Sequence, residues 1–325
     1  MMIDDPYHEG ELAAQQRANE SEMARNTSRM ISTTIVAGAL RFIEQQPMLV
    51  IGSIDANGRV WASMLFGLPG FVRALDDRTL EINGSQSRSA NDDPLWSHLS
   101  RSKFGEKANV GLLVIELGTR RRIRINGHVR NVSTERIIID VDRAYPNCPK
   151  YIQRRVWTTI DNDHQQTEAQ QTEASLATSP SHKGIELNEM QKTLITGADT
   201  FFVASAHPDH GVDASHRGGQ PGFVQILNNS QLRIPDFAGN SMFNTLGNFV
   251  SYPYAGLVFI DFERGRILQL TGQPEILWAQ DDAQDVTGGT QRFWQFDITG
   301  WQESALLMHL AWAFMDASPH IPKQQ

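Results

Sequence analysis

Residues 205–235 read SAHPDHGVDASHRGGQPGFVQILNNSQLRIP, and residues 53–83 read SIDANGRVWASMLFGLPGFVRALDDRTLEIN. The two stretches align without a gap at a constant offset of 152 residues, and 12 of the 31 positions are identical. Chance pairing would give roughly two identities, so the chain contains a duplicated unit. In the first stretch the identical residues are Ser53, Val60, Ala62, Ser63, Gly67, Pro69, Gly70, Phe71, Val72, Leu75, Leu80 and Ile82.

The match resumes further along the chain at an offset of 145 residues, so the first copy carries seven extra residues between the two blocks. In this second block Gly111, Leu112, Ile115, Arg121 and Gly127 correspond to Gly256, Leu257, Ile260, Arg266 and Gly272. A period of this length exceeds the 20–50 residues or so of solenoid repeats. The duplication therefore predicts two similar domains.

Composition narrows the class of protein. The chain has 325 residues, 40% hydrophobic and 20% charged, with a net charge of −8, which is typical of a globular protein. An acidic chain lacks the clustered cations of a nucleic-acid interface, so we expect no nucleic-acid partner. The single cysteine, Cys148, is typical of a reducing compartment. Without a long apolar run or a secretory signal, the sequence predicts a cytoplasmic protein with no membrane partner.

Short apolar runs separated by turn residues recur in both copies. In the first copy, a run at 48–54 is followed by a hairpin turn at 55–58, where Asn57-Gly58 suits positive φ angles. Further strands are expected at 60–66, 70–75, 79–82, 109–117 and 121–131. A helix is expected before each set, at 28–43 and at 185–195. The pattern predicts a mainly β protein, a β-barrel with a few helices, present in two tandem copies.

The chain divides into four predicted segments. Residues 1–28 are polar and are expected to form a loosely ordered N-terminal tail. The first barrel copy is placed at 29–160 and a flexible linker rich in Gln, Thr and Ser at 161–184. The second copy is placed at 185–325, with its tail from Trp301 to Phe314 expected to form a closing C-terminal helix.

Two neighbouring segments of the second copy, 213–223 and 234–245, suit a phosphate site. They combine Arg217 with glycine, hydroxyl and amide residues, which are groups that bind phosphate. Ordinary turn chemistry is the alternative, because glycine and asparagine are common in loops. The comparison of copies favours a site: the first copy has Met64-Leu65-Phe66 where the second has His216-Arg217-Gly218.

The second copy resembles the pyridoxamine 5′-phosphate oxidase-related family of flavin-binding split barrels. The resemblance rests on the segments 213–224, 232–240, 244–248, 256–259 and 266–272, in that order and spacing, and the first copy resembles the same fold more weakly. The segment 147–154 after the first barrel is also similar to one common in this group. Together these residues cover most of 30–275.

This resemblance implies two tandem FMN-binding split barrels, with flavin mononucleotide (FMN) held at an interface between barrels. The backbone at 219–224 would lie along the isoalloxazine ring, and the stretch around 235–241 would receive the ribityl phosphate. The chain departs from the oxidase proper, which has Ser-Arg-Lys where this sequence has Gly239-Asn240-Ser241. Pyridoxamine phosphate is therefore not the expected substrate, and Arg217 is the expected phosphate partner. The cofactor-binding residues implied are Ser215, Arg217, Gly219, Pro221, Gly222, Phe223, Val224, Pro235, Asp236, Asn240, Ser241, Asn244, Thr245 and Arg266.

Three other groups of residues can be interpreted either as functional sites or as ordinary structural or surface residues. His207, His210 and His216 lie close in sequence and could hold a metal, but the first two fall in an expected hairpin turn, so no metal site is predicted. Cys148 has cations nearby, yet a small packing residue is the favoured interpretation. The run at 120–124 places Arg121 on one strand face and its arginine neighbours on the other. Arg121 is expected on a solvated face, with an anion site as the alternative.

The expected function is that of an FMN-binding flavoprotein, an oxidoreductase acting on a small-molecule substrate, and no catalytic acid or base is assigned because the cofactor carries the chemistry. The alternatives are a non-catalytic flavin or haem binding or carrier protein, and an interaction protein without cofactor. The two copies are expected to pack as an internal pseudo-dimer, with a homodimer of chains as a further arrangement. One flavin is expected per chain.

Overall fold

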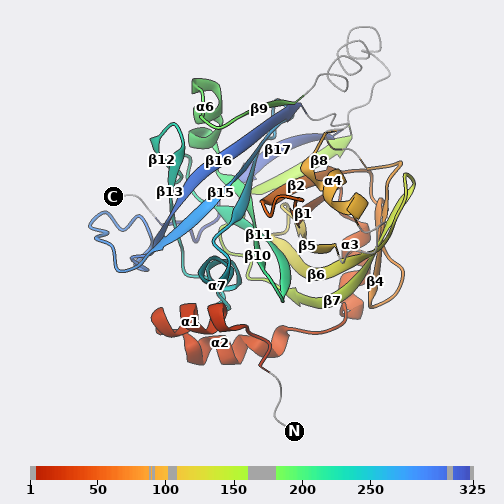
Figure 1. Ribbon diagram of the computed structural model, residues 1–325, viewed down its shortest axis with the longest axis horizontal. Helices are drawn as coiled ribbons and strands as arrows, with labels where there is room; N and C mark the ends of the chain where they lie inside the picture. The colour runs from red at the N-terminus through yellow and green to blue at the C-terminus, as the bar shows by residue number, and fades with distance from the viewer. Residues whose placement is uncertain are drawn as a thin grey trace.

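The computed structural model describes residues 5–87, 89, 92–101, 108–159, 181–305 and 310–322. Two antiparallel sheets make up most of it (Figure 1). The strands of the first sheet are β1 (Met48–Ile54), β2 (Val60–Phe66), β3 (Val72–Ala74), β4 (Thr79–Asn83), β5 (Asn109–Glu116), β6 (Arg121–Val132) and β7 (Arg136–Pro146). Those of the second are β10 (Thr200–His207), β11 (Gly211–Gly218), β12 (Gln225–Asn228), β13 (Gln231–Pro235), β14 (Ala255–Asp261), β15 (Arg266–Leu277) and β16 (Phe293–Ala305).

The two sheets have the same strand order. The first runs β2-β1-β5-β6-β7-β4-β3 and the second β11-β10-β14-β15-β16-β13-β12, so each strand has a counterpart in the other sheet. The strands β7 and β16 correspond in this order although neither offset found in the sequence relates them. The pairing registers also correspond, as Ser53 opposite Trp61 and Ser205 opposite Asp213 illustrate. The predicted fold class, mainly β with a few helices and two tandem barrel-type sheets, is confirmed. We call β1–β7 the first unit and β10–β16 the second unit.

Local sequence accounts for several elements. The β1–β2 turn forms where it was expected, with Gly58 at φ +79° and its N–H donated to the Asp55 carbonyl at 3.1 Å. Helix α6 (Glu189–Gly197) begins at Asn188, whose side chain accepts the N–H groups of Met190 and Gln191, as expected of an N-cap. The helix expected at 28–43 is shorter, because α3 (Ala37–Glu44) begins only after a short 3₁₀ turn and an extended segment.

The remaining elements correct predictions made for the two ends of the chain. These elements are α1 (Glu9–Arg17), α2 (Ser21–Thr27), the 3₁₀ turn Ser28–Met30, α4 (Pro94–Arg101), α7 (Asn244–Ser251), β8 (Arg154–Thr159), β9 (His182–Gly184) and β17 (Leu310–Asp316). No helix in the described part of the chain is long and apolar enough to cross a membrane.

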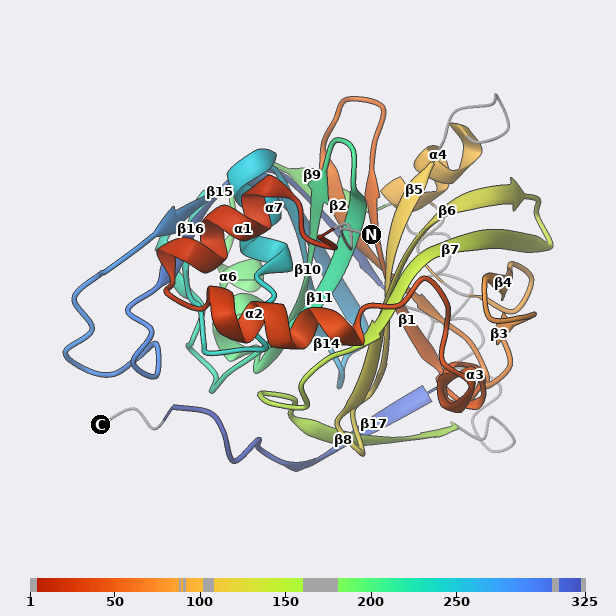
Figure 2. The ribbon, with the colours of Figure 1, turned by 90° about the horizontal axis from the view of Figure 1, so that it is seen from below.

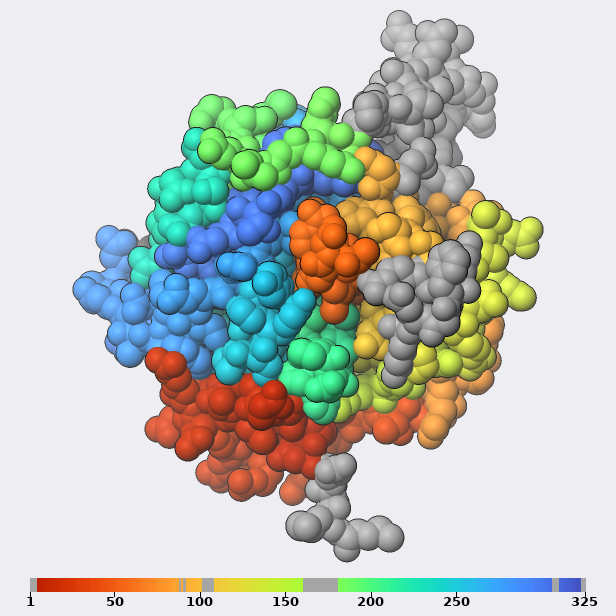
Figure 3. Space-filling model, viewed as in Figure 1, coloured from red at the N-terminus to blue at the C-terminus, as the bar shows by residue number. Residues whose placement is uncertain are grey.

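The predicted loose tail at 1–28 is wrong. Helices α1 and α2 lie across the second unit and against α7 (Figure 2), and they form part of its surface (Figure 3). The contact buries Ala14 together with polar Glu11 and Gln15. A polar segment resembled a tail because its buried side chains are satisfied by hydrogen bonds rather than by apolar packing.

The predicted C-terminal helix is also wrong. Trp301 lies in β16, which pairs along its length with β15, and Phe314 lies in β17, which pairs with β8 in a separate two-stranded sheet. This segment forms strands rather than a helix because β15 and β8 are available to pair with it. Of the predicted linker, 161–180 lie outside the described residues, while its last residues form β9, which pairs with β16.

A shared apolar core joins the two units. It contains residues of β1, β2 and β5 from the first unit and of β10, β11 and β14 from the second, with Val50, Met64, Phe202 and Val258 among its fully buried members. Each unit also has a separate core of its own. The apolar surface of each sheet is thus covered partly by the other unit.

Hydrogen bonds between the units come in corresponding pairs. Arg124 Nε donates to the Ala214 carbonyl at 3.0 Å, and its counterpart Gln269 Nε2 donates to the Ala62 carbonyl at 2.9 Å. Asn126 and its counterpart Thr271 bind the carbonyls of Val212 and Val60 in the same way. Each unit thus donates side-chain hydrogen bonds to the corresponding backbone carbonyls of the other unit.

Candidate functional site

A partly open cleft lies where β6 of the first unit meets β11 of the second. The first unit and the segment after it contribute Arg122, Arg124, Asn147, Cys148, Lys150 and Tyr151 to the lining. The second unit contributes Ser215, His216, Arg217, Gly218, Phe223, Pro235, Asp236, Phe237, Gly239 and Asn240. The cleft therefore belongs to both units.

A second hollow continues the first toward the start of α7. The two hollows share Arg124, Arg217, Asp236, Phe237, Gly239 and Asn240. The second hollow adds Glu20, Ser241, Phe243, Asn244, Thr245, Leu246 and Arg292. Because of the shared wall, we treat both hollows as one site, called the inter-unit cleft.

Arg124 is held rigidly at the centre of the inter-unit cleft. Besides the Ala214 carbonyl, it donates to Asn244 Oδ1 at 2.8 Å and to the Ser215 hydroxyl. Asp213 Oδ1 lies 3.7 Å from Arg124 Nη1. This guanidinium is therefore already satisfied, and its position on β6 links the first unit to β11 and α7.

Two other arginines of the cleft, Arg122 and Arg217, form no ion pair with a carboxylate in the part of the chain that the structure describes. Arg122 donates its Nε–H to the Cys148 carbonyl at 2.9 Å, and Nη2 donates to the same oxygen. Arg217 Nε is buried without a hydrogen-bond partner among the described residues. Desolvation lowers the pKa of Arg122 to about 9, helped by the charges of Arg124 and Arg217, so Arg122 remains a cation at neutral pH. Desolvation likewise lowers the pKa of Arg217, opposed by the Asp236 carboxylate.

The charges of Arg122 and Arg217 favour the binding of an anion in this part of the cleft. A positive charge removed from water is destabilising unless an opposite charge or hydrogen-bond acceptors compensate it. The Asp236 carboxylate of the cleft acts on Arg217, but it already accepts the Nε–H of Arg292 at 3.1 Å. The cleft is thus chemically suited to an anionic ligand between Arg122 and Arg217.

His216 lies in the wall of the same cleft and is only 4% exposed. Neither Nδ1 nor Nε2 has a hydrogen-bond partner among the described residues, and the ring meets Phe202 edge-on with centroids 5.7 Å apart. Desolvation lowers the pKa of His216 well below its usual value, and the charges of Arg122, Arg217 and Arg155 act in the same direction. The imidazole is therefore neutral at neutral pH.

The far end of the cleft is closed by the N-terminal helices. Glu20 Oε2 accepts the Ser241 hydroxyl at 2.5 Å, and Glu20 Oε1 accepts from Arg292 Nη1 at 3.1 Å. Asn244 at the start of α7 donates to Glu11 and accepts from Arg124. The segment predicted to be a tail therefore supplies two carboxylates that hold the cleft residues in place.

The structure brings most of the residues predicted from the sequence to this cleft. Those that line it are Ser215, Arg217, Phe223, Pro235, Asp236, Asn240, Ser241, Asn244 and Thr245. Ser215 and Thr245 are hydrogen-bonded to each other at 3.1 Å across the gap between β11 and α7.

Five predicted residues lie elsewhere. Gly219, Pro221 and Gly222 belong to the turn after β11, where Gly222 has φ +89° and donates its N–H to the Thr196 carbonyl at 2.7 Å. Val224 is buried in the core of the second unit. Arg266 begins β15 and forms an ion pair with Glu303, so the structure does not bring it to the inter-unit cleft.

The residues that sequence reasoning missed come mainly from the other unit. The alternation of the arginine run placed Arg122 and Arg124 on one face, but nothing in the local pattern revealed that this face meets β11. Arg121 points the opposite way and binds Glu116 at the exposed surface, as the plain interpretation predicted. Arg120 is in a turn with φ +57° and binds Asp316, so the strand alternation starts only after it.

The duplication relates the inter-unit cleft to a second position, where β15 of the second unit meets β2 of the first. The side chains at this second position differ from those of the cleft. Ile267 and Gln269 are the counterparts of Arg122 and Arg124. Ser63, the counterpart of Ser215, donates its hydroxyl to Asp93 at 2.5 Å, and burial raises the pKa of Asp93 to about 6. A buried carboxyl group there replaces the unpaired cations of the inter-unit cleft, so only one of the two related positions is suited to an anion.

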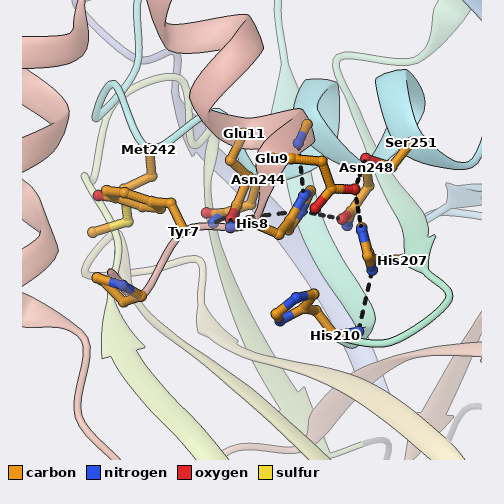
Figure 4. A network of polar contacts seen from close by, with 12 residues as sticks. Tyr7, His8, Glu9, Glu11, His207, His210, Met242, Asn244, Asn248 and Ser251 are labelled. Atoms are coloured by element: carbon orange, nitrogen blue, oxygen red, sulfur yellow. Dashed lines mark hydrogen bonds and ion pairs between the residues drawn. The ribbon is translucent and has the colours of Figure 1, made fainter. Parts of the chain in front are cut away.

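Histidines also gather where α1 meets the β10–β11 hairpin (Figure 4). Candidate ligand atoms of His8, Glu9 and His207 lie within 4.8 Å of one another. His8 Nδ1 accepts the Gly10 N–H at 3.1 Å, so its proton is on Nε2, which donates to Asn248 Oδ1 at 2.9 Å.

His207 has the same protonation pattern. Its Nδ1 accepts the N–H groups of Asp209 and His210, and Nε2 donates to Glu9 Oε1 at 2.8 Å. A metal ion binds a ring nitrogen that carries no proton. In both histidines Nε2 carries the proton and Nδ1 accepts backbone N–H groups, so neither ring offers a free nitrogen to a metal ion. The cluster instead attaches α1 to the β10–β11 hairpin through hydrogen bonds.

No protein-family model matches the chain, and no curated protein matches it. Among solved structures, the chain is similar to a candidate pyridoxamine 5′-phosphate oxidase from Lactobacillus delbrueckii at 16% identity, covering 38% of this chain and 98% of the other with a TM-score of 0.31. It is similar to HupZ of Group A Streptococcus at 11% identity, covering 41% and 98% with a TM-score of 0.28. It is also similar to an FAD-binding protein from Mesorhizobium loti at 12% identity, covering 38% and 99% with a TM-score of 0.25.

Proposed function

We propose that this chain is a flavoprotein that binds flavin mononucleotide in the inter-unit cleft and acts as an oxidoreductase on a small-molecule substrate. The observation that carries the proposal is the pair Arg122 and Arg217, two cations in one cleft that no described carboxylate pairs with. The resemblance of the second unit to flavin-binding split barrels independently points to the same ligand.

The charge of the ligand fits the charge of the cleft. A phosphate monoester carries nearly two negative charges at neutral pH, and it would be compensated by Arg122 from the first unit and Arg217 from the second. Arginine suits phosphate because its planar N–H groups donate in pairs. The ribityl phosphate would thus be bound across the interface rather than by one unit.

Aromatic side chains line the same cleft and suit a planar ring. Tyr151 and Phe237 come from different units, and their ring centroids are 5.0 Å apart. The Tyr151 hydroxyl donates to the Ala238 carbonyl at 2.9 Å, and Phe223 forms part of the opposite lining. Apolar rings with a few polar groups are the usual lining of a cofactor site.

A bound flavin supplies electron and hydride transfer, while the protein supplies position, charge and exclusion of water. Here Arg122 and Arg217 would hold the anionic end, and Arg124 would keep β6, β11 and α7 in register. We further propose that the two units act as an internal pseudo-dimer, because each binds the same backbone positions of the other. A cytoplasmic location is part of the proposal and is supported by the single cysteine.

An absorbance spectrum of the purified full chain tests the proposal. Flavin bands, retained on gel filtration or restored by adding FMN, are the expected result. Anaerobic bleaching of these bands by NADH or NADPH, followed by reoxidation with an added acceptor, would support the oxidoreductase over a flavin carrier. A protein that neither contains nor binds flavin, or that shows a haem Soret band, contradicts the proposal.

A further inference from the structure

His216 occupies a position where the fold itself requires no polar group. Its counterpart in the first unit is Met64, which is 1% exposed and packs in the apolar core between the units. The strands β2 and β11 are otherwise closely related, with identical Ala62-Ser63 and Ala214-Ser215 just before this position. An apolar side chain is therefore compatible with the backbone here.

The surroundings of His216 are cationic on several sides. The charges of Arg122 on β6, Arg217 on its own strand and Arg155 on β8 all act on it, while the apolar ring of Phe202 on β10 contacts it edge-on. Lys150, Cys148 and Asp236 line the same cleft. Asp236 is bound to Arg292, and Arg155 is bound to Asp199 at 2.7 Å. No described side chain offers the imidazole a hydrogen bond.

Burying two unpaired ring nitrogens destabilises the folded chain, because each group loses hydrogen bonds to water without replacement. A methionine at this position would avoid that loss. The arrangement becomes favourable once an oxyanion enters the cleft, since the anion can accept a hydrogen bond from the imidazole and offset the neighbouring cations. The unpaired histidine thus marks a ligand contact rather than a packing requirement.

We propose that His216 binds the ligand oxyanion together with Arg122 and Arg217, and that it takes up a proton from solvent as the anion enters. Without the anion, the arginine charges and the lack of water keep the imidazole neutral. A phosphate dianion reverses the local electrostatic potential, so the imidazolium form becomes the stable one and donates to the phosphate oxygen. The inference rests on the proposed function for the identity of the ligand, but its chemistry applies to any phosphate monoester and to inorganic phosphate.

The experiment is calorimetric titration of the full chain with FMN, with riboflavin and with inorganic phosphate, in phosphate-free buffers of different ionisation enthalpy at pH 7.5. Wild type should bind FMN with net proton uptake, and riboflavin, which lacks the phosphate, without it. His216→Met should bind FMN about 10- to 100-fold more weakly, the equivalent of a charge-assisted hydrogen bond, and without proton uptake. Its melting temperature without ligand should be higher than that of wild type.

The exposed His182 on β9 provides a matched control: His182→Met should change neither FMN affinity nor proton uptake. His216→Gln gives a second reading if the methionine variant does not fold, because glutamine can donate a hydrogen bond but cannot take up the proton. Unchanged FMN affinity and unchanged proton uptake in the His216 variants would overturn the inference while leaving the flavin proposal intact. If wild type binds no flavin but takes up a proton with inorganic phosphate, the flavin proposal fails and the role of His216 stands.

Discussion

At the scale of single residues, the two units differ most where their surroundings differ. Arg217 and Leu65 occupy equivalent strand positions, yet Leu65 is fully buried in an apolar core and Arg217 faces the inter-unit cleft. The strand geometry is the same in both units, so the side chain alone decides whether the position supports a core or a ligand. Such a position can be changed without altering the strand.

Replacing Arg217 with leucine, the residue that the first unit has, should weaken FMN binding while the fold is kept. The expected loss is about 1.5–3 kcal/mol of binding free energy, the range for hydrogen bonds to charged groups. Fluorescence titration of the apo-protein with FMN measures it, and circular dichroism checks the fold. Arg121→Leu, on the exposed face of β6, is the control and should bind FMN like wild type; equal affinity in the Arg217 variant would remove Arg217 from the site.

His8 makes the attachment of α1 sensitive to pH. Desolvation, followed by the charge of nearby His207, lowers the pKa of His8 to about 4. The unfolded chain, with an ordinary histidine pKa near 6.5, therefore binds the proton more readily between pH 6.5 and 4. The stability contributed by neutral His8 is fully present above pH 6.5 and is lost as the pH falls toward 4.

His8→Asn keeps a good N-cap but removes this titration. We expect the stability of wild type relative to the variant to fall on acidification from pH 6.5 to 4, by no more than about 1.4 kcal/mol per pH unit. Urea midpoints at pH 7.5, 6 and 5 measure the difference. The buried Glu11, whose pKa burial raises to about 7, lies 3.5 Å from the His8 ring, so the same comparison in a Glu11→Gln background separates the two titrations. A difference that stays constant with pH would show that His8 is not neutral in the fold.

At the scale of elements, the close approach of α1 and α7 depends on two glycines. A Cβ added at Gly10 would lie 2.3 Å from the Gly247 carbonyl oxygen, and one added at Gly247 would lie 2.5 Å from Glu11 Cα. The helices therefore pack backbone to backbone, which brings Glu11 to Asn244 and Gln15 to the Met242 carbonyl. This contact positions the N-terminal side of the inter-unit cleft.

Gly247→Leu should force α1 away from α7. The expected result is a loss of about 1–3 kcal/mol in unfolding free energy, the range for overpacking, and faster proteolysis within residues 5–27. Gly38→Ala in α3 is the control, because a Cβ there meets nothing within 4 Å. It should stabilise the chain by about 0.5–1 kcal/mol through helix propensity. An N-terminal segment that is equally protected in the Gly247 variant would contradict the proposed packing.

At the scale of the whole molecule, two units with one strand order form one site suited to an anion. The inter-unit cleft contains Arg122, His216 and Arg217. At the position related to it by the duplication, the counterparts are Ile267, Met64 and Leu65. The second position contains a buried Asp93 carboxyl instead of unpaired cations. A phosphate bound beside Asp93 would be repelled by that carboxyl group once it ionises, and the described cations nearby, Arg59 and Lys183, already pair with Asp55 and Asp92.

We therefore expect one FMN per chain. Calorimetric titration of apo-protein, with the concentration of active chain set by absorbance and amino-acid analysis, should give a single class of sites at a ratio of one. Gln269→Arg offers a reciprocal check, because one added cation beside Asp93 should not create a second tight site. Two equivalent tight sites in wild type would exclude the asymmetric arrangement.

The sequence alone determined the duplication, the mainly β fold and six strands of each copy along the chain, whereas β7 and the order of strands within each sheet came from the structure. What the sequence determined follows from local features: short apolar runs, turn residues such as Asn57-Gly58, and a repeat that returns at a constant offset. Local features survive in a single sequence because the backbone geometry of a strand or turn depends on residues close in the chain. The part of the site in the second unit was predictable for the same reason, since Arg217, Asp236 and Asn244 lie near turns and strand ends.

Only the tertiary structure decided which side chains complete the cleft. Arg122 and Arg124 lie about 90 residues from Ser215 in the chain, and their role follows from the contact of β6 with β11. The polar segment 5–27 became helical and ordered because its buried groups found partners on α7, and the apolar C-terminal segment became β17 because β8 offered an open edge. The physical reason is common to all three: burial and pairing depend on which surfaces meet, and no local pattern records the partner.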